Sequence, residues 1–117
     1  MKNELTITGI NIILEMVEEI IRDIGDKSFE EFEADNLLVR ATCFTLIQIG
    51  DSLAVISKKL NDLYPEVPWE YAKDMPNFIL HDFHHIHTHA VYNTASYDMP
   101  RLRDMLIQIK VDLMHQV

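Results

Sequence analysis

Histidine is the residue type that stands out most in this sequence. Five of the six histidines lie close together: His81, His84, His85, His87 and His89. Imidazole exchanges protons near neutral pH and is a common metal ligand. If this segment is helical, His81, His84 and His85 share one face, a spacing that could hold a divalent metal ion. The sequence has no HExxH pattern, so the alternative is a run of exposed histidines at a helix–loop junction.

The other reactive residue types give weaker signals. Cys43 lies in an apolar row with Val39 and Leu46, which predicts a small core residue rather than a nucleophile. The three glycines are isolated from one another, so no glycine-rich phosphate loop is present. A single cysteine also excludes an internal disulfide and is typical of a reducing compartment. We therefore expect a cytoplasmic protein.

Length and composition restrict the class of protein. A chain of 117 residues, 48% of them apolar, predicts one packed domain over residues 1–117. Only 3 Gly and 4 Pro are present, which argues against an all-β fold. The net charge of −9 has the wrong sign for tight non-specific binding to nucleic acid, although a local basic spot could exist. We see no signal-peptide pattern and no apolar run of the roughly 20 residues that span a bilayer, so we expect no membrane contact.

Apolar residues recur at helical spacing along almost the whole chain. They predict helices over residues 6–24, from Phe29 onwards, and over 36–63, 69–83 and 88–115. Gly25 is placed to be a left-handed C-terminal cap, and Ser28 with Glu31 forms a capping-box pattern. The expected fold is all-α: an antiparallel, up-and-down bundle of four to five helices.

Three prolines modify this pattern. Pro68 suits the first turn of the helix over 69–83, and Pro76 inside that helix predicts a kink near residues 72–74. Pro100 interrupts the last helix, and Asp98 is a plausible cap for the part that follows.

Two predicted helices carry more apolar surface than one neighbour needs. Residues 6–24 have a second apolar row, Ile12, Met16 and Ile20, and residues 36–63 are apolar on several sides. Such wide apolar faces suggest contact with a partner subunit. Gly50 costs about 1 kcal/mol relative to Ala inside a helix, so its presence predicts the close approach of another helix.

Three segments resemble the HepT-like branch of the HEPN superfamily, small helical proteins encoded beside minimal nucleotidyltransferases. Residues 47–52 (IQIGDS) are similar to the family pattern EIIGEA, and residues 64–69 (YPEVPW) to YPEIPW. Residues 74–83 (DMPNFILHDF) resemble GMRNILIHDY without a gap. The likeness continues through residues 90–92 and 97–102, so it covers most of the chain.

The resemblance implies a helical bundle that pairs as a homodimer. Active members of the family are toxins, metal-independent endoribonucleases that need no cofactor. Their motif is Arg, four residues, His, one residue, Tyr. The partner nucleotidyltransferase is the antitoxin, which in some systems adenylylates the motif Tyr. The chemistry suits these residue types, since a histidine can move the 2′-hydroxyl proton of RNA and an arginine can stabilise charge on the phosphoryl oxygens.

Carried over to this chain, the resemblance makes His81 the catalytic histidine and Asn77 the polar residue that follows the arginine. The arginine position is occupied by Pro76 and the tyrosine position by Phe83. Losing a charge-stabilising donor such as the motif arginine commonly slows catalysis by on the order of a hundredfold or more. Lys73 could replace this arginine only in part. A phenylalanine has no hydroxyl to adenylylate.

The leading interpretation is therefore a HepT-like toxin homologue of endoribonuclease lineage with a degenerate active site. The first alternative is a non-enzymatic substrate-binding or regulatory module of a nucleotidyltransferase. The second alternative is a metal-binding protein that uses His84, His85, His87 and His89.

Overall fold

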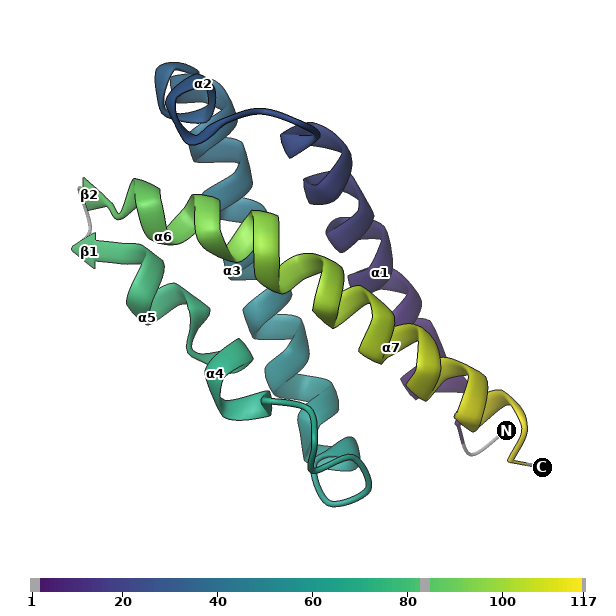
Figure 1. Cartoon of the computed structure of the whole chain (residues 1–117). Coiled ribbons are helices and arrows are strands. Elements are labelled where there is room, and N and C mark those ends of the chain that lie inside the picture. Colours follow the sequence, from purple (N-terminus) through teal and green to yellow (C-terminus); the bar gives the residue numbers. More distant parts are fainter. Residues whose placement is uncertain (1–2, 83–84, 117) are drawn as a thin grey trace.

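The fold is a helical bundle, described here by a computed structural model that covers residues 3–82 and 85–116 (Figure 1). Its first part comprises α1 (Glu4–Ile24), α2 (Phe29–Ala34), α3 (Asn36–Leu60), α4 (Trp69–Lys73) and α5 (Met75–Ile79). Next come two short strands, β1 (Leu80–Asp82) and β2 (His85–Ile86). The last part comprises α6 (Thr88–Asn93), a π-helical turn η1 (Thr94–Asp98) and α7 (Met99–Met114). The predicted all-α bundle is confirmed.

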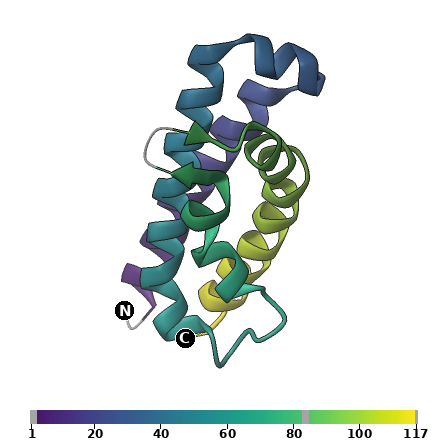
Figure 2. The same cartoon turned by 90° about the vertical axis from the view of Figure 1, so that its left-hand side faces the viewer.

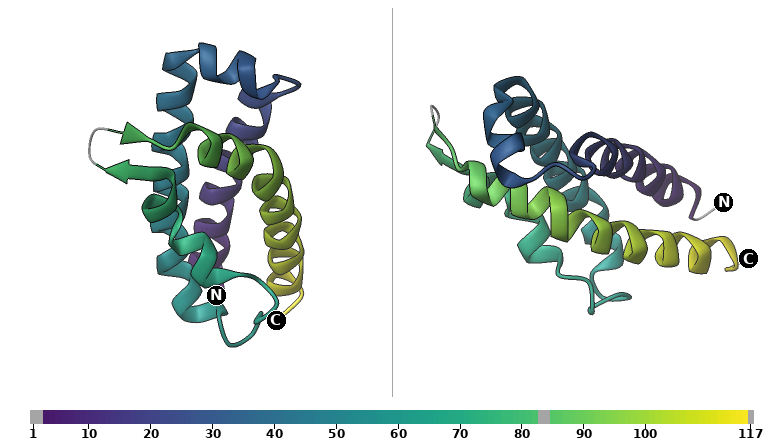
Figure 3. Two further views of the ribbon diagram at one scale, coloured as in Figure 1. Left: turned by 60° about the vertical axis from the view of Figure 1, so that its left-hand side comes forward. Right: turned by 45° about the horizontal axis from the view of Figure 1, so that its top comes forward.

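Three long helices form the centre of the bundle. α1 packs against both α3 and α7, and α4 and α5 cover α3 on the side away from α1 (Figure 2). The two termini lie together, where the Asn3 side-chain amide donates to the carbonyl of Leu113 at 3.4 Å. The β1–β2 hairpin projects on the side away from the termini (Figure 3).

The buried residues follow the helical spacing of the sequence. α1 contributes Ile10, Ile13, Val17, Ile20 and Ile24 to the core, and α7 contributes Leu102, Leu106, Ile109 and Leu113. Other apolar residues of these two helices, Leu14, Ile21 and Met105, are only partly buried. Burial of these apolar side chains is the main favourable term in folding, at about 25 cal/mol per Å² removed from water.

The helix caps follow the predicted residues with one difference. Ser28 Oγ accepts from the Glu31 backbone at 3.1 Å, and Glu31 Oε1 accepts from the Ser28 backbone at 3.0 Å. These hydrogen bonds lower the pKa of the exposed Glu31 carboxyl and complete the predicted capping box. Gly25 has a positive φ of 51°, but its ψ of −128° lies outside the left-handed helical region. It is therefore a glycine cap of a different conformation from the one predicted.

The structure contradicts the prediction of one kinked helix over residues 69–83. The chain breaks at Asp74, as the proline predicted, and α5 then ends at Ile79. Pro76 lies in the first turn of α5, where a residue without an N–H removes no intrahelical hydrogen bond. Pro68 is the N-cap of α4 rather than a residue of its first turn.

After Ile79 the backbone becomes extended. Leu80 pairs with Ile86 and Asp82 with His85 in an antiparallel hairpin. The amide of His87 closes this segment by donating to the carbonyl of Ile79 at 2.7 Å. Residues 81 and 85 are therefore not on one helical face, which removes the premise of the predicted helical histidine site.

Pro100 does not interrupt the last helical region, contrary to the prediction. Its missing N–H is accommodated by a π-turn upstream, where the Met99 amide donates to the Thr94 carbonyl five residues back. The chain thus continues from α6 through η1 into α7 without a break. Asp98 occupies the predicted N-cap position of α7, but its carboxylate makes no cap hydrogen bond and instead accepts from the Tyr71 hydroxyl at 3.0 Å.

α3 is the one helix, within the described residues, that is long and apolar enough to cross a membrane. In this fold 44% of its apolar window is buried inside the protein. Core helices of soluble proteins have the same length and composition, so this feature is explained by the position of α3 at the centre of the bundle.

The predicted close approach at Gly50 is confirmed and involves Pro76. A Cβ at position 50 would lie 3.2 Å from Pro76 Cδ and 3.4 Å from the Ala72 carbonyl oxygen. Both neighbours are held by backbone geometry, so neither can rotate aside. The absence of a side chain at Gly50 is thus what lets α4 and α5 pack directly on α3.

We expect Gly50→Ala to lower the free energy of unfolding by about 1 kcal/mol, measured by chemical denaturation. Ala gains about 1 kcal/mol in helix propensity, but overpacking against Pro76 and Ala72 costs about 1–3 kcal/mol. Gly9→Ala is the matched control, because its Cβ would meet only a terminal methyl, Ile56 Cγ2, at 3.2 Å. A Gly50 variant as stable as the Gly9 variant would contradict this account of the contact.

Candidate functional site

The segment predicted to carry the chemistry lies on α5 and the hairpin. Asn77 is exposed on α5, and its side-chain amide donates to Asp74 Oδ1 at 3.1 Å. The Asn77 backbone amide also donates to the Asp74 carbonyl at 2.9 Å. These bonds tie Asn77 to Asp74, the residue that precedes α5.

The backbone of His81 lies at the centre of β1. Its side chain, and the predicted residues Phe83 and His84, lie outside the described part of the structure. The roles of His81 and Asn77 as catalytic residues therefore remain predictions. What the fold does establish is that His81 follows α5 on a strand, so its position relative to Pro76 is not that of two residues on one helix.

Pro76, which the resemblance aligns with the motif arginine, is a packing residue in this structure. Pro76 is half-buried, and its ring faces Gly50 on α3. Lys73, the suggested substitute cation, lies on α4 and forms an ion pair with Glu70 at 2.8 Å. Because that pair lies before the chain break at Asp74, it does not support a role for Lys73 in place of the arginine.

A groove runs between α3 and the hairpin beside the His81 backbone. We call it the α3–hairpin groove; it has a volume of about 620 Å³ and is lined by Asn36, Val39, Arg40, Cys43, Phe44, Ile47, Leu80, His85, Ile86 and Thr88. Its walls are partly apolar, and its polar groups are Arg40, His85, Asn36 and Thr88. This is the concave surface nearest to the strand on which His81 lies.

Arg40 is the cation of this groove. It is exposed on α3, and its guanidinium has no hydrogen-bond or ion-pair partner among residues 3–82 and 85–116. Sequence reasoning missed it, because Arg40 and the hairpin are far apart in the chain and nothing in a single sequence indicates which side of α3 the hairpin covers. A guanidinium without a partner is suited to binding a phosphate.

The described histidines do not converge. His85 lines the groove, whereas the His89 ring stacks on Phe29 with centroids 3.6 Å apart and an interplanar angle of 14°. Across the described side chains, no three His, Cys, Asp or Glu groups are placed to hold a metal ion. The interpretation as a His-cluster metal site thus gains no support from His85, His87 and His89, and its fourth residue, His84, lies outside the described residues.

Cys43 is a wall residue of the groove rather than a nucleophile. It is buried, as predicted, and burial raises the pKa of its thiol. A raised pKa leaves less of the reactive thiolate near neutral pH.

Comparison with known proteins points to one family. A sequence model of the family described as "Ribonuclease HepT-like" matches residues 12–109. A protein of Methanocaldococcus jannaschii named "Putative RNase" is 27% identical, with 86% of this chain and 87% of that protein covered. A "Putative RNase" of Caldanaerobacter subterraneus is 26% identical, with 83% and 87% covered. A "Probable ribonuclease HepT" of Thermococcus cleftensis is 28% identical, with 77% and 79% covered. No solved structure matches the chain significantly.

Proposed function

Because the chain belongs to the HepT-like ribonuclease family of the HEPN superfamily, we propose that it binds RNA in the α3–hairpin groove. The observation that carries the proposal is Arg40, a guanidinium without a described partner in the groove beside the His81 strand. RNA presents a phosphate and a 2′-hydroxyl at each nucleotide. Arg40 would hold the phosphate, and His81 would move the 2′-hydroxyl proton.

We propose in addition that the active site is degenerate. Pro76 offers no positive charge, and its ring is committed to packing against Gly50. Arg40 reaches the groove from a different helix, so it binds phosphate without taking the position that the motif arginine has relative to His81. RNA binding would then persist while cleavage is slow. This favours, as a second candidate function, a non-enzymatic module that binds RNA or a partner and performs no chemistry.

A toxin–antitoxin pairing with a minimal nucleotidyltransferase is the third part of the proposal, supported by the family likeness. Phe83 stands at the tyrosine position and cannot be adenylylated, so the partner would neutralise this protein by binding rather than by modifying that residue. Copurification with a nucleotidyltransferase encoded beside it tests the pairing.

The apolar outer surface of α1 and α3 supports a homodimer in the cytoplasm. Ile12 is 53% exposed and Val55 66% exposed, and they border an apolar groove of about 210 Å³. Phe44, 62% exposed on α3, lines the α3–hairpin groove. Pairing through α1 and α3 would cover Ile12 and Val55, leave the α3–hairpin groove open to RNA, and bring the two His81 strands towards a shared cleft.

Arg40→Gln should weaken the binding of single-stranded RNA several-fold, because one phosphate contact is lost. Fluorescence anisotropy with a labelled oligonucleotide measures the change. Arg22→Gln is the matched control, since Arg22 lies in an acidic depression with Glu15, Glu18 and Glu19. Equal affinities for the two variants would argue against RNA in this groove.

Pro76→Arg should raise the rate of RNA cleavage by at least about tenfold, because it restores a guanidinium near His81. Pro76→Gln is the control for the charge, since it removes the proline ring as Pro76→Arg does but adds no positive charge. Adding His81→Ala to Pro76→Arg should remove the gain. Rapid cleavage by the unaltered protein would show that the site is not degenerate.

Val55→Asp should convert a dimer to a monomer, as measured by light scattering during gel filtration, because a carboxylate would be buried at the paired surface. Val111→Asp is the control, a similar change at a 41% exposed position on α7. A monomeric unaltered protein at micromolar concentration would refute the proposed dimer.

A further inference from the structure

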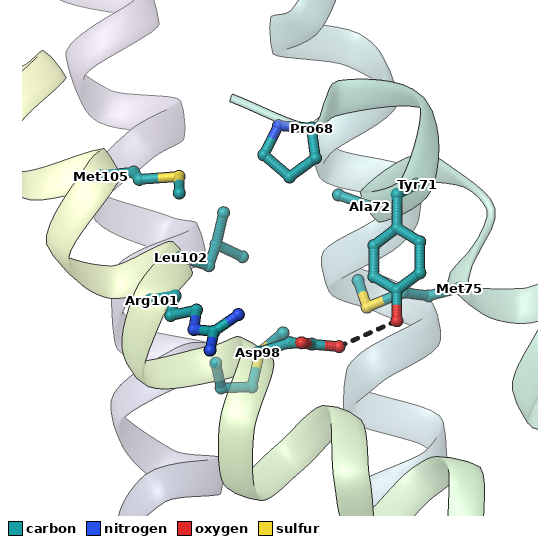
Figure 4. A pocket seen from close by; sticks show the side chains of 9 residues that line it. Pro68, Tyr71, Ala72, Met75, Asp98, Arg101, Leu102 and Met105 are labelled. Carbon is teal, nitrogen blue, oxygen red and sulfur yellow. Dashed lines mark hydrogen bonds between the residues drawn. The ribbon is translucent and has the colours of Figure 1, made fainter. Parts of the chain in front are cut away.

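A second pocket lies between the α4–α5 segment and the η1–α7 segment (Figure 4). We call it the Tyr71 pocket; its volume is about 310 Å³, within the range of small-molecule sites. Met75, Met99 and Leu102 form a buried apolar floor, and Met105 lies at one side (Figure 4). Methionine sulfurs make favourable contacts with aromatic rings, so this floor suits a flat aromatic group.

Three polar side chains stand at the edge of the floor. The Tyr71 hydroxyl donates to Asp98 Oδ2 at 3.0 Å, which leaves Asp98 Oδ1 available to a ligand. Arg101 lies one helical turn beyond Asp98 and makes no hydrogen bond or ion pair with any residue that the structure describes. The Tyr71 ring is 52% exposed beside them. The pocket thus combines an aromatic face, a carboxylate that only accepts, and a guanidinium without a described partner.

We propose that the Tyr71 pocket binds one base of single-stranded RNA, with Asp98 accepting from the exocyclic amino group and Arg101 contacting an adjacent phosphate. The identity of the ligand rests on the proposed function, binding of RNA. Unpaired bases are commonly recognised by stacking on aromatic or guanidinium groups and by hydrogen bonds to their edges.

The carboxylate gives the pocket a preference among bases. Cytosine presents an N4 amino group that Asp98 can accept from, and adenine presents one at N6. Uracil has a carbonyl oxygen on each side of its N3–H group, O2 and O4, and these oxygens repel a carboxylate. The Tyr71 hydrogen bond holds Asp98 in place, so the preference is built into the free protein. Cytosine should therefore bind better than uracil.

The two sites lie at opposite ends of α5. Met75 lines the Tyr71 pocket and Leu80 lines the α3–hairpin groove. α5 itself, five residues long, rises about 7.5 Å, a length comparable to two nucleotide steps of a stacked strand. A single RNA strand could therefore place one base in the Tyr71 pocket and a neighbouring phosphate in the α3–hairpin groove. The bound base would then determine which phosphate of the strand lies in the groove.

The test measures binding of short oligocytidine and oligouridine by fluorescence anisotropy. The unaltered protein should prefer oligocytidine by about tenfold, and Asp98→Asn should reduce that preference because an amide accepts and donates. Arg101→Gln should weaken both oligonucleotides about equally and lower the salt dependence. Arg22→Gln should leave both affinities unchanged. A purely structural role for Asp98 would change stability and leave the cytidine-to-uridine ratio as it was.

A second measurement separates this proposal from the proposed function. Binding of CMP and UMP is followed through the NMR signals of the Met75, Met99 and Met105 methyl groups. Shifts with CMP and weaker shifts with UMP support the pocket even if no oligonucleotide binds, an outcome that would contradict the RNA function alone. Oligonucleotide binding without a base preference and without methyl shifts would overturn the pocket and leave the function standing. Absence of all binding would overturn both.

Discussion

The contact between Gly50 and the start of α5 is the constraint on which the rest of the functional region depends. Only a residue without a side chain lets Pro76 and the Ala72 carbonyl approach α3 so closely. That approach determines where α4 ends, where α5 begins and the direction in which the chain leaves toward the hairpin. The α3–hairpin groove on one side of α5 and the Tyr71 pocket on the other both follow from this docking.

The same contact gives Pro76 a structural role. A proline in the first turn of a short helix costs no hydrogen bond, and here its ring fills the space above Gly50. Position 76 therefore contributes packing against α3. Positive charge at the proposed RNA surface comes from Arg40 on α3 and Arg101 on α7. With a net charge of −9, the protein would depend on such local cations rather than on its overall field.

Sequence reasoning succeeded where local periodicity and packing agree. The stripes of α1 and α7, the Ser28–Glu31 capping box and the break at Asp74 all follow from residue types within a few positions of one another. It failed at residues 80–82, which were predicted to be helical and form strand β1. The motif likeness was unaffected by that error, because it depends on residue order rather than on backbone conformation.

The sequence by itself determined the all-α class, the positions of the main helices and the family. Only the tertiary structure decided that Arg40 shares a groove with the hairpin, and that the carboxylate of Asp98, at the N-cap of α7, accepts from Tyr71 instead of capping the helix. The reason is physical: helix periodicity and caps are set by neighbours along the chain. Which side chains from distant helices meet is set by how those helices pack, and a single sequence does not encode that in any local pattern.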